Sequence, residues 1–465
     1  MRQTWRTVWA GYLLLTAGAP AAARAQGMYY EEVEKDGRIY VFNVAAEYER
    51  WVKTGETGRA ITRLGAGPNG ETVVADSETA LELFFFKHGI AEVVERPKPP
   101  TLRIEWRDGK TRITTDNAYL EMSNRVQARY THDLPDDSRQ IAGTAERGDP
   151  VGSFRIRRAK LKIEGWTFTQ FVTYEVQLNW PAVTGSNPGA FLEDANITWD
   201  PTKQGTFKVV FGQNKVAFGH QELTSSGSQL FVDRAEVSNQ YARGRDTGLS
   251  VIGVLGGNKL EYRAGVYNGN GLTRSANDND RFQYDARLMW QVSGDQPLKQ
   301  RAWVSGPYYS EGDFESTDRP LVAVAASVES NDFHRTTAGN DLRSRVFGFD
   351  GTLKYKGVFA TAEYYLRERT PETGPRFDSD GWFAQLAYNF GRGRRYAVAG
   401  RYGTFDPSSL VSGNDRKEWR VGLSWFYSRH TLKVQADFGQ LEDEAFDSGR
   451  GTKSSELRLQ TQWVF

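Results

Sequence analysis

The stretch Val172-Thr173-Tyr174-Glu175-Val176-Gln177-Leu178-Asn179-Trp180 decides the fold class of this chain. Apolar and polar side chains alternate along it without a break, and the aromatic rings of Tyr174 and Trp180 lie on its apolar face. Successive side chains of a β-strand point to opposite faces, so this alternation indicates a strand with one apolar and one polar face.

The same pattern recurs from residue 117 to the end of the chain. Segments of about ten residues alternate in this way and are separated by turns or loops. We count sixteen of them, starting near residues 118, 154, 170, 191, 205, 246, 258, 281, 321, 345, 357, 380, 395, 416, 430 and 454.

Three features favour a membrane barrel over a soluble sandwich. The apolar faces end in aromatic rings, as in the girdles at the two membrane interfaces. The polar faces carry full charges, which a closed soluble core could not bury. Short turns such as 356–357 alternate with long polar loops such as 369–379. The predicted girdle residues are Tyr174, Trp180, Trp382, Trp419, Trp425, Trp463 and Phe465.

Composition narrows the function classes. The chain has 465 residues, 60 aromatic rings, no Cys and a formal charge of +1. The absence of Cys excludes a disulfide framework and thiolate metal sites, and the balanced charge gives no indication of a nucleic-acid partner. No run of 18 apolar residues predicts a transmembrane helix.

The chain begins with an export signal. Residues 1–25 combine Arg2 and Arg6 with a short apolar stretch and the small-x-small site Ala23-Arg24-Ala25, which is typical of a cleaved signal peptide. Removing this segment leaves 56 basic against 58 acidic residues. We expect the mature protein to begin near Gln26 and to reach the bacterial outer membrane.

Three regions follow the signal peptide. Residues 26–94 predict a small α+β module, residues 95–116 a Pro-containing linker, and residues 117–465 the 16-stranded antiparallel transmembrane β-barrel. In the module we expect strands at 38–44 and 71–75, a helix at 47–53, and a second helix that runs from a cap at Asp76 or Ser77 to about His88. An even strand number returns the chain to its starting side, which predicts that the module is periplasmic.

Residues 65–70 match the pattern G-x-G-x-x-G of dinucleotide sites. That chemistry requires a helix N-terminus after the last glycine, whereas Asn69-Gly70 leads into the strand-like Thr72-Val73-Val74. We therefore interpret this segment as a hairpin turn.

Phe465 ends the last alternating strand, on the face that carries Trp463. A terminal aromatic residue on such a strand resembles the signal that bacterial outer-membrane assembly machinery reads. We expect that machinery to be a partner, together with outer-membrane lipid.

Several motifs resemble the phosphate-selective porin O and P family. They are the stretches 154–165 (FRIRRAKLKIEG), 211–219 (FGQNKVAFG) followed by 222–226 (ELTSS), and 264–271 (AGVYNGNG). The resemblance spans roughly residues 115–465, and it implies a 16-stranded, usually trimeric, anion-preferring porin whose long third loop narrows the pore. The module at 26–94 departs from it.

A barrel of sixteen strands leaves a lumen too wide for side chains to fill, so we expect it to hold water and to select ions at its narrowest ring. The long connection 213–244 is the candidate constriction. Candidate pore-lining residues are Arg158, Lys160, Lys162, Lys208, Lys215, His220, Arg234, Arg263 and Arg287. Acidic residues share the same strand phase, and residues 101–465 hold 47 basic against 45 acidic residues. Phosphate preference is therefore implied by the resemblance rather than by charge balance.

We weighed other functions against a channel for small anions. A barrel enzyme would need a nucleophile beside a His partner, but the chain has neither G-x-S-x-G nor H-E-x-x-H. His220-x-Glu222 and residues 277–280 are interpreted as loop polarity rather than as metal ligands. We expect no catalytic site, cofactor or metal. A non-conducting structural or adhesive barrel and a non-selective porin remain the alternatives.

Overall fold

The computed structural model describes residues 29–90, 102–135, 150–180, 192–202, 205–257, 259–272, 276–294, 307–315, 319–333, 342–444 and 453–465. The chain divides into two compact units, Met1–Pro99 and Pro100–Phe465. The predicted signal peptide lies outside the described residues.

The N-terminal unit is the predicted α+β module. It contains β1 (Glu31–Lys35), β2 (Arg38–Phe42), α1 (Ala45–Thr54), β3 (Ile61–Arg63), β4 (Thr72–Ala75) and α2 (Glu78–His88). The four strands form one sheet in the order β1-β2-β4-β3, in which only β2 and β4 are parallel. The short strands β1 and β3 add to the two strands expected from the sequence.

The expected signals set the local structure of this unit. The Ser77 hydroxyl accepts a hydrogen bond from the amide of Ala80 (3.0 Å) at the start of α2, and Gly89 ends the helix with a φ of 64°. The glycine pattern at 65–70 connects the antiparallel strands β3 and β4, with the Gly70 amide bonded to the Gly67 carbonyl (3.0 Å). It is a hairpin turn, as predicted.

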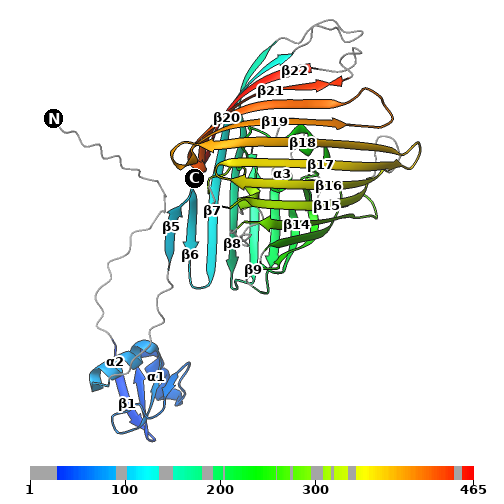
Figure 1. Ribbon diagram of the computed structural model, residues 1–465. Coiled ribbons are helices and arrows are strands. Elements are labelled where there is room, and N and C mark those ends of the chain that lie inside the picture. The colour runs from blue at the N-terminus through cyan, green and yellow to red at the C-terminus, as the bar shows by residue number, and fades with distance from the viewer. Residues whose placement is uncertain are drawn as a thin grey trace, which may run out of the picture. The chain divides into compact units, whose positions relative to one another are not determined.

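The second unit is a closed antiparallel barrel of sixteen strands (Figure 1). The strands are β7 (Ala118–Pro135), β8 (Val151–Thr167), β9 (Val172–Asn179), β10 (Leu192–Trp199), β11 (Lys208–Lys215), β12 (Arg245–Leu255), β13 (Leu260–Tyr267), β14 (Gln283–Ser293), β15 (Leu321–Phe333), β16 (Leu342–Tyr355), β17 (Val358–Pro371), β18 (Phe377–Phe390), β19 (Tyr396–Asp406), β20 (Arg416–His430), β21 (Leu432–Asp443) and β22 (Lys453–Val464). Pairing of β22 with β7 closes the barrel. None of the sixteen predicted starts differs from the observed one by more than three residues.

Alternating exposure along the strands confirms the predicted faces. In β18, Trp382 and Leu386 are 41% and 60% exposed, whereas the neighbouring Phe383 and Gln385 are buried. The other predicted girdle residues also point outward. Trp180, Trp419, Trp425, Trp463 and Phe465 are exposed, and Tyr174 is half-buried.

Two chain segments fold into the barrel. The first is 216–244, between β11 and β12, with the short helices α3 (His220–Leu223) and α4 (Glu236–Tyr241). The second is 307–315, between β14 and β15, which begins with the 3-10 turn η3 (Pro307–Tyr309). It belongs to the connection 294–320, whose length has no explanation in the sequence pattern.

The predicted linker 95–116 contains structure. Residues 103–114 form a hairpin of β5 (Arg103–Arg107) and β6 (Lys110–Thr114), and β6 pairs with β7. Its outward residues Ile104 and Trp106 are exposed. Within the ranges given above, no helix combines the length and apolar character needed to cross a membrane.

Candidate functional site: a charged passage beside a filled half of the barrel

The segment 216–244 fills one half of the lumen. Its apolar residues Val216, Phe218, Val237 and Tyr241 pack on inward side chains such as Phe383. Leu230 and Phe231 form a second cluster on the inward faces of β17 to β20. Burial of these rings excludes water from this part of the barrel.

Backbone groups of the same segment bond to the barrel wall. The amides of His220 and Gln221 donate to the Glu363 carboxylate (3.2 and 2.6 Å). The Val232 amide donates to Asp437 (3.0 Å), and the Glu236 amide to Glu418 (3.0 Å). These bonds satisfy a buried, largely irregular backbone, and they fix the segment to strands β17, β20 and β21 of the wall.

Glu311 joins the two inward segments. One of its carboxylate oxygens accepts hydrogen bonds from the Leu230 amide (2.7 Å) and the Gln385 side chain (2.9 Å), and the other from the Gln221 side chain (3.2 Å). Its neighbour Asp313 accepts from the Gly357 amide (2.6 Å). Both carboxylates are buried. Segment 307–315 therefore links segment 216–244 to the barrel wall.

The other half of the lumen holds a cavity of about 850 Å³, which we call the passage. Its wall comes from β7 to β12, with further residues from β20, β22 and the β5–β6 hairpin, and residues 225–228 and 234 of the inward segment form its opposite side. Ten of the lining side chains are Lys or Arg and five are Asp or Glu. Basic and acidic residues are nearly balanced over residues 101–465, whereas the basic residues of the passage outnumber its acidic ones by two to one.

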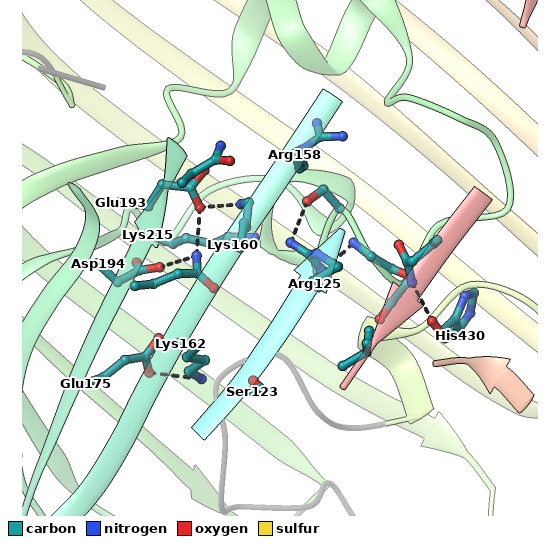
Figure 2. A pocket seen from close by; sticks show the side chains of 18 of the residues that line it. Ser123, Arg125, Arg158, Lys160, Lys162, Glu175, Glu193, Asp194, Lys215 and His430 are labelled. Atoms are coloured by element: carbon teal, nitrogen blue, oxygen red, sulfur yellow. Dashed lines mark hydrogen bonds and ion pairs between the residues drawn. The ribbon is translucent and has the colours of Figure 1, made fainter. Parts of the chain in front are cut away.

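A column of cations on β8 follows the passage (Figure 2). Arg158, Lys160 and Lys162 are two residues apart, so they lie on the same inward face. On the neighbouring strand β7, Arg125 lies opposite Lys160. Arg155 and Arg157 continue the lining beyond a bulge in the pairing of β7 with β8.

Carboxylates compensate part of this column. Lys160 bonds to Glu193, which also accepts from Asn179 (2.8 Å). Lys162 lies 2.7 Å from Glu164 and 3.3 Å from Glu175. A cross-strand ion-pair lattice of this kind is a common feature of barrel walls.

The least compensated charge lies on Arg125 and on Arg129, Arg157 and Arg158, which share Asp233, whereas Arg458 also pairs with Asp437 (2.7 Å). The Arg125 guanidinium donates to the hydroxyls of Ser225 (3.0 Å) and Ser226 (3.2 Å), and among the described residues no carboxylate lies within 4 Å of it. Asp233, on the inward segment, is shared by four guanidinium groups. These belong to Arg129 (2.6 Å), Arg158 (3.4 Å), Arg157 (3.8 Å) and Arg458 (3.8 Å).

The nine predicted pore residues fall into two groups. Five line the passage, namely Arg158, Lys160, Lys162, Lys215 and Arg234. Two of these also hold the inward segment, because the Lys215 ammonium donates to the carbonyls of Leu223 (3.0 Å) and Thr224 (3.2 Å), and Arg234 donates to those of Gln221 (3.1 Å) and Thr224 (3.1 Å).

The other four are not among the described residues that line the passage. Arg263 and Arg287 are buried under segment 307–315, where they pair with Glu261 and Asp350. His220 is buried, and its ring stacks on Tyr309 (5.5 Å between centroids). Lys208 begins β11, at the end of the barrel where the short turns lie.

The sequence interpretation missed five lining cations, which are Lys110, Arg125, Arg155, Arg157 and Arg245. Arg125 could have been found, since it shares the polar phase of β7 with Glu121 and Ser123. Arg157 could not, because the bulge shifts the phase of β8 at that point. Among the described residues, no three His, Asp or Glu side chains gather closely enough to hold a metal ion.

Comparison with known proteins agrees with this geometry. The model of the family "Phosphate-selective porin O and P" matches residues 136–465. None of the curated proteins matches the chain. The barrel is similar to the anion-selective porin from Comamonas acidovorans (9% identity, 75% of this chain and 100% of that one, TM-score 0.51). It is also similar to the outer membrane channel DcaP of Acinetobacter baumannii (10% identity, 75% of this chain and 98% of that one, TM-score 0.51). OmpT of Vibrio cholerae is similar as well (10% identity, 76% of this chain and 99% of that one, TM-score 0.51).

At these identities the solved structures support the fold alone, whereas the family match covers most of the chain and includes the cation column of β8 and the inward segment. With its outward apolar face and charged interior passage, the chain belongs to the phosphate-selective porin O and P family and is an outer-membrane porin.

Proposed function

We propose that this porin is an anion-preferring diffusion channel for phosphate or similar small oxyanions. The observation that carries the proposal is the lining of the passage, in which ten basic side chains face five acidic ones. A narrow conduit of one sign of charge concentrates counter-ions along its length. The name of the matched family supports the same class of permeant.

The arrangement of the cations suits passage rather than tight binding. Guanidinium forks match the oxygens of an oxyanion in pairs, whereas lysine offers a compact charge. The residues Arg157, Arg158, Arg125 and Lys162 are spread along two strands instead of converging on one point. An anion can therefore exchange one partner for the next, which conduction requires.

Reversal potentials across a planar bilayer test the preference. Under a KCl gradient, we expect the reversal potential of the wild type to have the sign that indicates anion selectivity. Arg125→Gln should reduce the preference, because it removes a cation that has no carboxylate partner among the described residues. Arg416→Gln is the matched control, since Arg416 is 55% exposed on β20 and pairs with Asp443 (3.6 Å) outside the passage. Cation selectivity of the wild type would contradict the proposal.

A second measurement concerns the oxyanion. Inorganic phosphate added to a KCl bath should reduce the chloride current by competing for the same cations, and the effect should weaken in Arg125→Gln. A chloride current that is indifferent to phosphate would leave an anion channel without oxyanion preference.

We also propose that the N-terminal module is periplasmic, that the porin is a homotrimer in outer-membrane lipid, and that the assembly machinery binds its C-terminal strand. An even number of strands supports the location, because both ends of the barrel chain then lie on one side. The fold of OmpT from Vibrio cholerae, solved in a trimer form (11% identity, TM-score 0.50), is similar. Light scattering of the detergent-solubilised protein tests the trimer, and added protease on intact cells tests the location.

A further inference from the structure

The β5–β6 hairpin occupies an edge of β7 that the closing strand leaves free. Strand β22 reaches its last partner at Arg125, whereas β7 begins at Ala118. Residues Tyr119 to Met122 pair instead with β6. An unpaired strand edge is costly in lipid, so the hairpin completes the wall at its seam.

The tip of the hairpin fits closely against the end of β22. Gly109 has a φ of 72°, and a Cβ atom at this position would lie 2.5 Å from the carbonyl oxygen of Val464. Only glycine combines this conformation with so close an approach. The tip is therefore part of the barrel rather than a loose arm.

The inward face of the hairpin reaches the passage. Asp108 and Lys110 are among the lining residues, at the end where the short turns lie. The Lys110 ammonium bonds to Glu121 and lies 3.8 Å from Glu164. Arg112 also donates to Glu121 (2.7 Å), so the hairpin supplies cations that face Glu121 and Glu164.

Charge is distributed unevenly along the passage. Around this mouth the carboxylates of Glu121, Glu164 and Glu175 oppose the cations, whereas the middle holds Arg125 and the arginines around Asp233. Without Lys110, an anion entering here would first meet carboxylates that lack part of their counter-charge.

We propose that the β5–β6 hairpin forms the short-turn mouth of the conduction path, and that Lys110 determines selectivity by neutralising Glu121 and Glu164. The inference rests on the proposed anion preference for its direction, and it concerns residues that precede the region matched by the family model. The hairpin thus belongs to the channel, although the sequence pattern suggests a linker.

Paired variants on the hairpin test the role of Lys110. Lys110→Gln should shift the reversal potential towards cations, and Lys110→Gln with Glu121→Gln should return it close to the wild-type value. Arg103→Gln is the control, because Arg103 carries the same charge at the base of the hairpin, is 69% exposed and pairs with Glu105. Equal shifts for Lys110→Gln and Arg103→Gln would overturn the inference.

Chemical modification tests the position directly, because the chain has no cysteine. A negatively charged methanethiosulfonate reagent added to an inserted, conducting Lys110→Cys channel should lower its anion current, and it should leave Arg103→Cys unchanged. This readout does not depend on the folding of a damaged variant, since each channel conducts before modification. No current change at position 110 would contradict the inference.

The outcomes separate this inference from the proposed function. If the wild type proves cation-selective but modification of Lys110→Cys alters the current, the hairpin does form the mouth of the conduction path and the proposed anion preference is wrong. If the wild type is anion-selective and position 110 behaves like position 103, the proposed anion preference stands and the assignment of the hairpin to the mouth is wrong.

Discussion

The two halves of the barrel interior share one strand pattern and differ in what covers it. Under segment 216–244 the inward positions include the rings of Phe359, Phe383 and Phe426, which are buried as in a soluble core. Along the passage the same strand phase carries Ser123 and Gln177. Alternation therefore fixes which side of a strand faces inward, and the inward segments fix whether that side is packed or wet.

Charges also have different roles in the two halves. In the filled half Arg420 is buried and bonds to Glu418 (2.7 Å) and Glu456 (2.6 Å), and Arg401 bonds to Glu418 (2.7 Å). Buried charges must be paired, since removal of one partner is strongly destabilising. Cations of the passage such as Arg157 and Lys162 keep part of their side chains exposed (36% and 20%), so their removal should affect selectivity more than stability.

Truncation of a ring in the filled half should have the largest effect. Phe231 is 1% exposed, and the Arg401 guanidinium lies 4.6 Å from its ring centre. Phe231→Ala should cost about 3–5 kcal/mol of stability, because it removes contacts and leaves a cavity. The urea midpoint of the detergent-solubilised protein measures this loss. Ser123→Ala, on the passage, should change stability by less than about 0.5 kcal/mol. Equal losses would remove the distinction between the halves.

Removal of the acceptor that joins the inward segments should come next. Glu311→Ala leaves the buried Leu230 amide without its partner, at a cost of about 1–3 kcal/mol. Segment 216–244 should then leave its packed position more often, so single-channel records should show larger and more variable conductance. Glu311→Gln keeps an acceptor oxygen and should behave closer to the wild type. If the conductance of Glu311→Ala is as small and steady as that of the wild type, apolar packing alone holds segment 216–244 in place.

Ionic strength should separate the halves without a mutation. The Debye length falls from about 10 Å at 0.1 M salt to about 3 Å at 1 M. The anion preference of the passage should decline over this range, because cations such as Arg157 and Lys162 are partly exposed, whereas the buried pairs of the filled half should be little affected. Reversal potentials at a constant salt ratio, and urea midpoints at both salt concentrations, measure the two responses. A preference independent of salt would indicate selection by size.

The smallest effect is expected where the two halves meet. Arg157 lines the passage, its side chain is 36% exposed, and it lies 3.8 Å from Asp233 of the inward segment. Arg157→Gln should lower stability by less than about 1 kcal/mol, as for other exposed pairs. It should also reduce anion preference less than Arg125→Gln does, because Asp233 already offsets part of its charge. A larger stability loss would place Arg157 with the packed half.

Local pattern predicted the strands but could not predict the division of the lumen. Period-two alternation depends on nearest neighbours, so the sixteen strands and their outward rings could be predicted from residues alone. Whether Arg263 or Lys162 meets water depends on where segments 216–244 and 307–315 pack, and residues far apart in the sequence set that packing. Arg263 and Lys162 are indistinguishable by phase, yet Arg263 is buried beside the Tyr309 ring and the Lys162 side chain is 20% exposed along the passage.

The hairpin at the seam also bears on how the barrel closes. Gln127 of β7 and Gln462 of β22 are 335 residues apart in the chain, and their side chains bond in the closed wall. Contacts of such separation form late, because the intervening chain must first be ordered. The β5–β6 hairpin forms from residues close together in the chain, and β6 already pairs with Tyr119 to Met122 of β7. Strand β22 can therefore pair only with the rest of the β7 edge, from Arg125 onward. The backbone amide and carbonyl of Phe465 both bond to Asn124, and Gly109 lies directly against Val464. A shift of β22 by one residue towards the hairpin therefore has no room, so the hairpin limits the register of the last strand.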